Sequence, residues 1–281
     1  MVKLKELRKL SSAELETLGN DSPLADVDFV LTNLLRFQKS DLIFGEKVLG
    51  EEQEELFFEA MERLKQGEPV QYVVGGCEFM SLWFRVNSAT LIPRADTEIL
   101  VEEIIGQMSD KENVEIFEIG TGSGCIAVSL AYYLKSARVT AVDISKEALR
   151  TATENAKDMG VGDICTFLEC DIMKGFPKLK KLPDVVVSNP PYIPKRDILD
   201  LEKKVKEFEP LSALDGGEDG LDFYRRIAET TELAPGGILA FEVGIGQAEA
   251  VADIMKSRFC DIEIKCDLAG IKRVVVGRQR F

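Results

Sequence analysis

The sequence predicts an α/β fold in which a doubly wound, mainly parallel sheet follows a small helical domain. Three observations carry this prediction. From residue 114 onward, strand-like and helix-like segments alternate, and such alternation produces right-handed crossovers between parallel strands. The last two strand-like segments have almost nothing between them, which predicts an antiparallel hairpin at one edge of the sheet. Residues 1–68, by contrast, show only helical periodicity.

The N-terminal region, residues 1–68, is predicted to form the helical domain. Apolar residues recur there at three- and four-residue spacing over 4–18, 23–37 and 51–67. Acidic residues outnumber basic ones in this region. Two uses of the domain stay open: a bundle that only packs on the rest of the chain, or a docking surface for a macromolecular substrate.

A linker, residues 69–93, is predicted to join this region to the sheet. The segment is rich in aromatic and β-branched residues and is interrupted by two adjacent glycines, which indicates a β-hairpin. The third domain, residues 94–281, then begins with a helix over 95–108, for which Asp96 is the expected N-cap.

The remaining elements of the third domain alternate between strand and helix. Short runs of branched apolar residues predict the strands, and apolar positions three or four apart predict the helices. The expected strands are residues 114–119, 138–143, 164–169, 184–188, 236–243, 261–267 and 272–277. The expected helices are residues 125–134, 145–159, 220–233 and 247–259.

Composition excludes several classes of protein. The chain has 281 residues and is 45% hydrophobic, as expected of a folded globular protein. Its net charge of -14 disfavours direct binding to nucleic acid, which proteins grip with clustered Lys and Arg. No apolar run approaches the roughly 18 residues of a transmembrane helix, and the N-terminus does not resemble a signal peptide. We therefore expect a cytoplasmic protein with no membrane partner.

The cysteine and histidine counts limit the chemistry. The 6 cysteines form no C-x-x-C pair, so we expect reduced thiols and no metal site. The chain has no histidine, the side chain that most often shuttles protons near neutral pH. Catalysis must therefore use carboxylates, amides, the backbone or a cofactor.

A glycine-rich turn, "EIGTGSGC", lies between the first strand of the sheet and the following helix. Gly120, Gly122 and Gly124 permit a tight turn and the close approach of a ligand, and the helix N-terminus offers free N–H groups. The G-x-G-x-G spacing departs from the dinucleotide fingerprint G-x-G-x-x-G. A plain strand-to-helix turn is the alternative interpretation.

Acidic residues near the turn favour a cationic nucleoside ligand. Asp143 ends the second strand, where a carboxylate accepts hydrogen bonds from ribose hydroxyls. Asp171 follows the third strand and can bind an adenine amino group while Ile172 flanks the ring, although a helix cap is another role open to Asp171. Glu118, two residues before the turn, suits a ligand with positive charge. S-adenosylmethionine, which carries sulfonium and ammonium groups, therefore fits better than NAD.

The segment "SNPPY" ends the fourth strand beside the first, where doubly wound sheets bind ligands. The two prolines stiffen the backbone, so the Asn189 side chain and the Pro190 carbonyl are held in place. Two acceptors aimed at one point can hold an NH2 group by both hydrogens, while Tyr192 offers a flat face to the planar group that bears it. A plain end of a strand needs neither the amide nor the aromatic ring.

Further motifs carry a family resemblance. The segments "LIPRADTEILVE", "EIGTGSGCIAVSLA", "SNPPYIP", "EPLSALDGGEDGLDFYRRI" and "GGILAFEVGIGQ" together resemble the protein-glutamine N5-methyltransferases of the HemK type. Those enzymes modify the Gly-Gly-Gln (GGQ) loop of peptide chain release factors. The NPPY tetrapeptide alone is shared with adenine-N6 methyltransferases, whereas "LIPRADTE" and "ALDGGEDGLDFYR" are specific to the family.

The resemblance implies a seven-stranded, Rossmann-like methyltransferase sheet. It also implies an enzyme that uses S-adenosylmethionine, releases S-adenosylhomocysteine and has release factors as partners. The residues expected to bind the cofactor are Glu118, Gly120, Thr121, Gly122, Ser123, Gly124, Asp143, Ile144, Asp171, Ile172 and Asn189. Those expected to bind the glutamine amide are Asn189, Pro190, Pro191 and Tyr192, of which Asn189, Pro190 and Tyr192 are the expected catalytic residues. Arg94 is also expected to bind the substrate, and together with the segment 193–220 it is expected to border the entrance.

Three other hypotheses remain open at this point. The chain could methylate adenine in nucleic acid, although its acidity and the family-specific motifs count against this. It could be a nucleotide-dependent oxidoreductase, which the glycine spacing disfavours. It could also bind the cofactor as a scaffold without catalysis.

Overall fold

The computed structural model describes residues 3–280, which form two compact units. The smaller unit contains the residues up to Gly76 together with Glu202–Phe208, and the larger unit contains Cys77–Leu201 and the residues from Glu209 onward. Each unit has a hydrophobic interior of its own. Within residues 3–280, no helix is long and apolar enough to cross a membrane.

The smaller unit consists of helices, most of which contribute apolar residues to one core. In α1 (Leu4–Thr17), buried side chains recur every three or four residues, in agreement with the predicted helical periodicity. Phe57 and Met61 of α4 (Glu51–Lys65) lie in the same buried cluster. The other helices of this unit are α2 (Pro23–Phe29), the π-helical segment η1 (Val30–Leu34), α3 (Lys39–Phe44), α5 (Val70–Val74) and α9 (Lys203–Phe208).

The predicted linker contains a helix as well as a hairpin. The sequence predicts extended structure after residue 69, but Val70–Val74 form α5, which ends at Gly75 with a left-handed φ of 80°. A two-stranded hairpin of β1 (Gly76–Phe79) and β2 (Leu82–Arg85) follows. Val70 and Val73 are buried in the core of the smaller unit. This packing outweighs the strand preference of the branched residues in α5.

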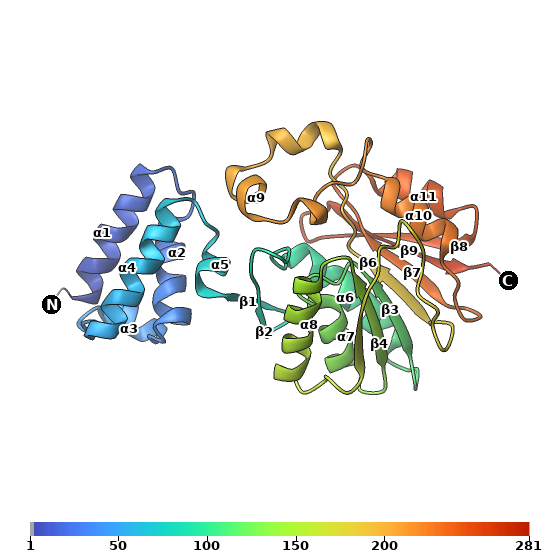
Figure 1. Cartoon of the computed structure of the whole chain (residues 1–281), viewed down its shortest axis with the longest axis horizontal. Coiled ribbons are helices and arrows are strands. Elements are labelled where there is room, and N and C mark those ends of the chain that lie inside the picture. Colours follow the sequence, from blue (N-terminus) through green and yellow to red (C-terminus); the bar gives the residue numbers. More distant parts are fainter. Residues whose placement is uncertain (1–2, 281) are drawn as a thin grey trace. The chain divides into compact units, whose positions relative to one another are not determined.

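The larger unit contains a seven-stranded mixed sheet, which confirms the predicted fold class (Figure 1). The strand order is β5-β4-β3-β6-β7-β9-β8. Strands β3, β4, β5, β6 and β7 all run parallel to one another. Strand β9 runs antiparallel to both β7 and β8. The strands are β3 (Glu115–Ile119), β4 (Arg138–Asp143), β5 (Cys165–Glu169), β6 (Val185–Ser188), β7 (Ile238–Glu242), β8 (Phe259–Cys266) and β9 (Lys272–Gln279).

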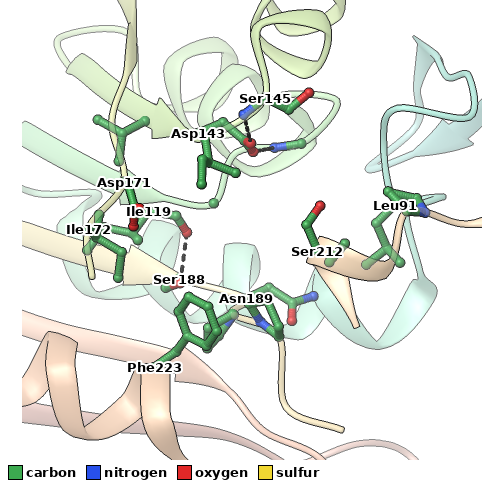
Figure 2. Close-up of a pocket in the computed structure, with 18 of the residues that line it drawn as sticks. Leu91, Ile119, Asp143, Ser145, Asp171, Ile172, Ser188, Asn189, Ser212 and Phe223 are labelled. Carbon is green, nitrogen blue, oxygen red and sulfur yellow. Dashed lines mark hydrogen bonds between the residues drawn. The ribbon is translucent and has the colours of Figure 1, made fainter. Parts of the chain in front are cut away.

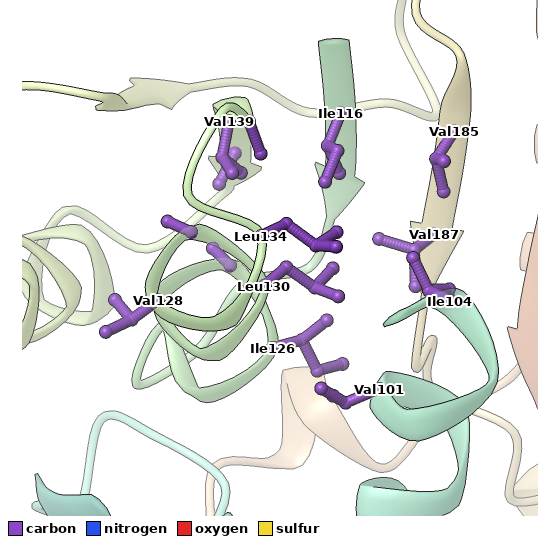
Figure 3. Close-up of a cluster of buried hydrophobic side chains, with 14 of the residues drawn as sticks. Val101, Ile104, Ile116, Ile126, Val128, Leu130, Leu134, Val139, Val185 and Val187 are labelled. Carbon is purple, nitrogen blue, oxygen red and sulfur yellow. The ribbon is translucent and has the colours of Figure 1, made fainter. Parts of the chain in front are cut away.

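Alternation along the strands divides the core between the two faces of the sheet. Val185 and Val187 of β6 belong to one buried cluster, and Val186 belongs to the other. Figure 3 shows the first cluster, in which Ile126 and Leu130 lie near the strand residues. This face is covered by α6 (Ala95–Met108), α7 (Cys125–Tyr133) and α8 (Lys146–Asp158). The other face is covered by α10 (Asp222–Thr230) and α11 (Ala248–Met255).

The predicted N-cap of α6 is wrong. Arg94 occupies the N-cap position, and Asp96 lies in the first turn of the helix. A carboxylate in the first turn still interacts favourably with the positive end of the helix dipole. Asp96 also pairs with Arg273 of β9 at 2.8 Å, so it ties the start of the helix to the sheet.

Candidate active site

A pocket lies at the carboxyl edge of the sheet, where the strand order reverses between β3 and β6. Its volume is about 350 Å³. Figure 2 shows Asp143 and Asp171 on its wall, with Asn189 on another part of the wall. The predicted site residues that line it are Gly120, Gly122, Asp143, Ile144, Asp171, Ile172, Asn189, Pro190 and Pro191. The predicted residues that do not line it are Arg94, Glu118, Thr121, Ser123, Gly124 and Tyr192.

The glycines of the turn have different tasks. Gly120 and Gly122 line the pocket, and all three glycines have positive φ. A Cβ on Gly124 would lie 2.9 Å from the Cβ of Ala152 in α8, too close for a real side chain. Gly124 therefore allows α7 and α8 to pack closely. In the dinucleotide fingerprint the third glycine also serves close packing, at a longer spacing.

The carboxylate of Asp143 is held at the tip of β4 by backbone donors. Its Oδ2 accepts a hydrogen bond from the Gly122 N–H at 2.9 Å, and its Oδ1 accepts one from the Ser145 N–H at 2.9 Å. Burial raises the pKa of Asp143, and these hydrogen bonds oppose the increase. Each oxygen keeps a further lone pair, so a fixed pair of acceptors is available to ligand hydroxyls.

Asp171 and Ile172 follow β5 on the pocket wall. No helix begins there, because residues 172–174 form a turn, so the helix-cap alternative for Asp171 is wrong. Asp171 instead pairs with Lys174 at 2.9 Å, which lowers the pKa of its carboxyl group. Ile172 is buried and offers an apolar surface, while its carbonyl accepts a hydrogen bond from Arg226 at 2.9 Å.

Glu118 lies behind the glycine turn and does not line the pocket. Its side chain is buried, and its Oε2 accepts a hydrogen bond from Thr121 at 2.6 Å. Its Oε1 has no hydrogen-bond partner in the described part of the chain. Burial raises the pKa of Glu118 to about 8, against the opposing effect of Thr121. A nearby positive charge would favour the ionised form of this carboxyl group.

Asn189 follows β6 and lines the pocket together with the two prolines after it. The preceding Ser188 is fully buried and donates its hydroxyl to the Ile119 carbonyl at 2.7 Å, so the end of β6 is fixed to β3. The Asn189 Nδ2 donates to Thr97 Oγ1 at 3.2 Å. With Nδ2 engaged, the Asn189 Oδ1 is the side-chain acceptor left for a ligand.

Tyr192 is placed differently from the other residues of the NPPY motif. Its ring packs against the buried cluster on the sheet face that α10 and α11 cover. Its carbonyl accepts a hydrogen bond from Gln247 Nε2 at 2.9 Å. Burial raises the pKa of its phenol to about 12. The aromatic ring on the pocket wall is instead Phe223 (Figure 2). The stacking role of Tyr192 stays a prediction.

Other pocket-lining residues were not singled out by the sequence reasoning. Leu91 lies within the "LIPRADTE" motif, and Ser212 and Phe223 lie in or beside the "ALDGGEDGLDFYR" motif. Those motifs were the available signal, but nothing in their spacing says which of their residues face a cavity. The segment predicted to border the entrance does supply wall residues, namely Pro210, Ser212, Ala213 and Asp215.

Within residues 3–280, neither a metal cluster nor a disulfide is found. Across residues 3–280, no group of three or more Cys, Asp or Glu side chains is arranged to hold a metal ion. The cysteines at positions 77, 125, 165, 170, 260 and 266 are free thiols.

Two family models match the chain. Residues 6–75 match the PrmC N-terminal domain, and residues 110–244 match a methyltransferase domain. The chain is 38% identical over 278 residues to a release factor glutamine methyltransferase of Bacillus cereus, covering 96% of this chain and 97% of the relative. It is 45% identical over 219 residues to one of Geobacter sulfurreducens, covering 77% of this chain and 75% of the relative.

A solved structure supports the fold at lower identity. The hMettl16 catalytic domain, crystallised in complex with the MAT2A 3'UTR hairpin 6, aligns with a TM-score of 0.52 and 13% identity over 81% of each chain. At that identity the likeness concerns the fold alone.

Proposed function

The chain belongs to the release factor glutamine methyltransferase family, and from this membership we propose that it methylates the glutamine side chain of the GGQ motif in peptide chain release factors. The methyl donor is S-adenosylmethionine, and the modified atom is the amide nitrogen, N5. The observation that carries the proposal is the position of Asn189 on the wall of the same pocket as Asp143 and the glycine turn. The groups proposed to bind the amide and the nucleoside thus line one cavity.

The residues of the pocket fit the cofactor in charge and shape. Asp143 presents fixed acceptors suited to ribose hydroxyls, and Gly120 and Gly122 leave room for close approach to the backbone. Ile172 and Ile144 offer apolar surface to a flat ring. The unpaired oxygen of Glu118 lies behind the turn, where a cationic group in the pocket would stabilise its charge. When bound, the cofactor supplies a methyl group made electrophilic by the adjacent sulfonium.

The substrate amide is proposed to bind at Asn189 and Pro190. Asn189 Oδ1 and the Pro190 carbonyl would accept the two hydrogens of the glutamine NH2 group. An amide nitrogen is a poor nucleophile because its lone pair is conjugated, and the ~18–20 kcal/mol barrier to peptide rotation shows the scale of that delocalisation. Acceptors that bind both hydrogens turn the lone pair toward the methyl group.

Alignment of the amide nitrogen with the methyl group should contribute more to the rate than removal of a proton from that nitrogen. Hydrogen bonds that strengthen as the nitrogen becomes cationic contribute about 1.5–3 kcal/mol each. Positioning two bound reactants contributes about 7–11 kcal/mol. The alkylated nitrogen is acidic and loses its proton readily, so the reaction needs no histidine.

The test is a methyl-transfer assay with radiolabelled S-adenosylmethionine. A release factor should become labelled, and a variant factor with Ala in place of the GGQ glutamine should not. Equal labelling of the two factors, or labelling of neither, contradicts the proposal. Parallel incubations with DNA and RNA test adenine methylation, which a labelled nucleic-acid product would support instead. We place the reaction in the cytoplasm, which suits a chain whose 6 cysteines are free.

A further inference from the structure

A second buried carboxylate, Glu242, lies beside the proposed substrate site. Glu242 is the last residue of β7, and Phe241 before it pairs with Ser188 of β6, so Glu242 and Asn189 leave neighbouring strands together. The Glu242 side chain is in the core, with the residue only 3% exposed. Its Oε2 has no hydrogen-bond partner among the described residues. The proposed methyl transfer assigns no task to this group.

Thr97 connects Glu242 to Asn189. Thr97 lies in the first turn of α6 and is 2% exposed. Its Oγ1 accepts the hydrogen bond from Asn189 Nδ2 at 3.2 Å. Hydrogen bonding with the Thr97 and Asn189 side chains lowers the pKa of Glu242, against the burial that raises it to about 7. The three side chains therefore form one polar group, in which Thr97 and Glu242 are buried and Asn189 lines the pocket.

The donors and acceptors of the three side chains determine which of them donates each hydrogen bond. An ionised carboxylate can only accept hydrogen bonds, so beside an ionised Glu242 both the Thr97 hydroxyl and the Asn189 amide must act as donors toward it. Thr97 Oγ1 can then only accept from Asn189, and the Asn189 amide must turn Nδ2 toward it. That orientation leaves Oδ1 free for the pocket that Asn189 lines. The amide oxygen and nitrogen are nearly the same size, so packing alone would not choose between the two orientations.

Building on the proposed function, we propose that Glu242 is a positioning residue, which acts on the Asn189 amide directly and through the Thr97 hydroxyl to hold Oδ1 facing the substrate nitrogen. The reversed amide would present its own NH2 group to the substrate NH2 group. One of the two acceptors for the glutamine amide would be lost, and the lone pair would no longer be aligned. Glu242 contacts neither substrate nor cofactor in this scheme.

Several other charged or titratable groups act on Glu242 or respond to its charge. The carboxylate of Asp96 raises the pKa of Glu242, and the guanidinium of Arg273 lowers it. The charge of Glu242 in turn raises the pKa values of Tyr192, Tyr224 and Cys125. Because the pKa of Glu242 is about 7, assays at about pH 8.5 keep this carboxyl group mainly ionised.

The first test compares Glu242→Gln, Thr97→Val and Thr97→Ser at that pH, with a release factor as substrate. Glutamine keeps the shape of Glu242 but adds a donor, which permits Thr97 and Asn189 to reverse. Misplacing a reacting group can cost about 100-fold in rate, and kcat of the Gln and Val variants should fall toward that extent while the cofactor Kd stays near the wild-type value. Thr97→Ser keeps the hydroxyl and should retain much more of kcat than Thr97→Val.

A matched control separates this effect from a general cost of altering buried threonines. Thr231→Val makes the same change at a threonine that is 1% exposed and whose Oγ1 has no partner in the described chain. It should leave kcat unchanged. The double variant of Thr97→Val and Glu242→Gln should lose no more than the worse single variant, because both break one chain of hydrogen bonds. Wild-type kcat in Glu242→Gln, or additive losses in the double variant, would overturn the proposal.

The second test needs no substrate and so remains informative if the proposed function fails. The side-chain NH2 signals of Asn189, assigned with Asn189→Asp, are followed by NMR in protein carrying isotope-labelled asparagine. In the wild type they should exchange slowly with water, because Nδ2 is bound to Thr97. Glu242→Gln and Thr97→Val should shift them and speed their exchange, whereas Thr231→Val should not. Unchanged Asn189 signals in Glu242→Gln would refute the positioning role even in an active enzyme.

Discussion

Arg94, at the N-terminus of α6, forms an ion pair with Glu209, a residue 115 positions later in the chain. The Glu209 side chain is only 2% exposed, whereas that of Arg94 is 42% exposed. Burial raises the pKa of Glu209, and the nearby Arg94 guanidinium opposes the increase. Pro210 and Ser212 of the pocket wall follow Glu209 directly, so the pair fixes the segment that borders the pocket.

Replacing Arg94 by Met should destabilise the protein by about 1–3 kcal/mol, because it leaves a buried carboxylate without its partner. The effect should lie toward the lower end, since water screens a half-exposed guanidinium. Urea unfolding measures the change. Adding Glu209→Gln to the same protein should recover part of the loss. A single variant that unfolds at the wild-type midpoint would show that the pair contributes nothing.

Gly124→Ala should destabilise the protein because the new Cβ would lie 2.9 Å from the Cβ of Ala152 at a φ of 81°. Overpacking and the left-handed backbone together should cost about 2–4 kcal/mol. Gly160→Ala is the matched control, since Gly160 has a φ of 71° and nothing within 4 Å of the added carbon. The control should cost only about 1–2 kcal/mol, the price of the backbone conformation alone. Equal losses in thermal or urea unfolding would remove the packing argument.

Asp143→Asn should weaken S-adenosylmethionine binding by about 10- to 100-fold, because hydrogen bonds to a charged acceptor contribute about 1.5–3 kcal/mol. Asp171→Asn should have a smaller effect, since Lys174 already engages the Asp171 carboxylate. Isothermal titration calorimetry of the two variants compares them directly. Equal affinities for the Asp143 variant and the wild type would exclude Asp143 from the cofactor site.

Cofactor binding near pH 7 should release a proton from Glu118. Burial raises the pKa of Glu118 to about 8, so the free protein holds this carboxyl group mainly protonated at neutral pH. A sulfonium or ammonium charge favours the ionised form and lowers that pKa, so up to about one proton is released. Calorimetry in buffers with different ionisation enthalpies counts the protons. Glu118→Gln should abolish the release, and proton uptake in the wild type would contradict the expected sign.

The sequence predicted the sheet well because its pattern is local. The buried run at 185–187 and the acid and amide residues at strand ends require only the alternation of strands and helices to bring them to one edge. Asp143 and Asn189 could therefore be placed on the pocket wall without a structure. Helix α5 could not be predicted in the same way, because its valines have strand preference and only the core of the smaller unit makes them helical.

The difference between local sequence pattern and tertiary packing also explains why some pocket residues could not be predicted. Phe223 and Leu91 reach the pocket through the packing of distant segments, which spacing does not encode. Tyr192 does not line the pocket; it is partly buried against the core, and Gln247 donates to its carbonyl, so its stacking role stays a prediction. Thr97 and Glu242 carried no sequence signal, since Thr97 is one of several polar residues in α6 and Glu242 is a single polar residue in β7. Each acquires a role only through its position beside Asn189.

The membership of α9 in the smaller unit has a practical consequence for dividing this protein. The backbone passes from one unit to the other after Gly76, again after Leu201 and once more after Phe208. A fragment that stops at Gly76 would lack one of its own helices, and a fragment that starts at Cys77 would carry that helix without its partners. Studies of the first half in isolation should therefore compare a fragment that ends at Gly76 with one to which residues 202–208 have been joined, because α9 contributes no buried residue to the core of the smaller unit.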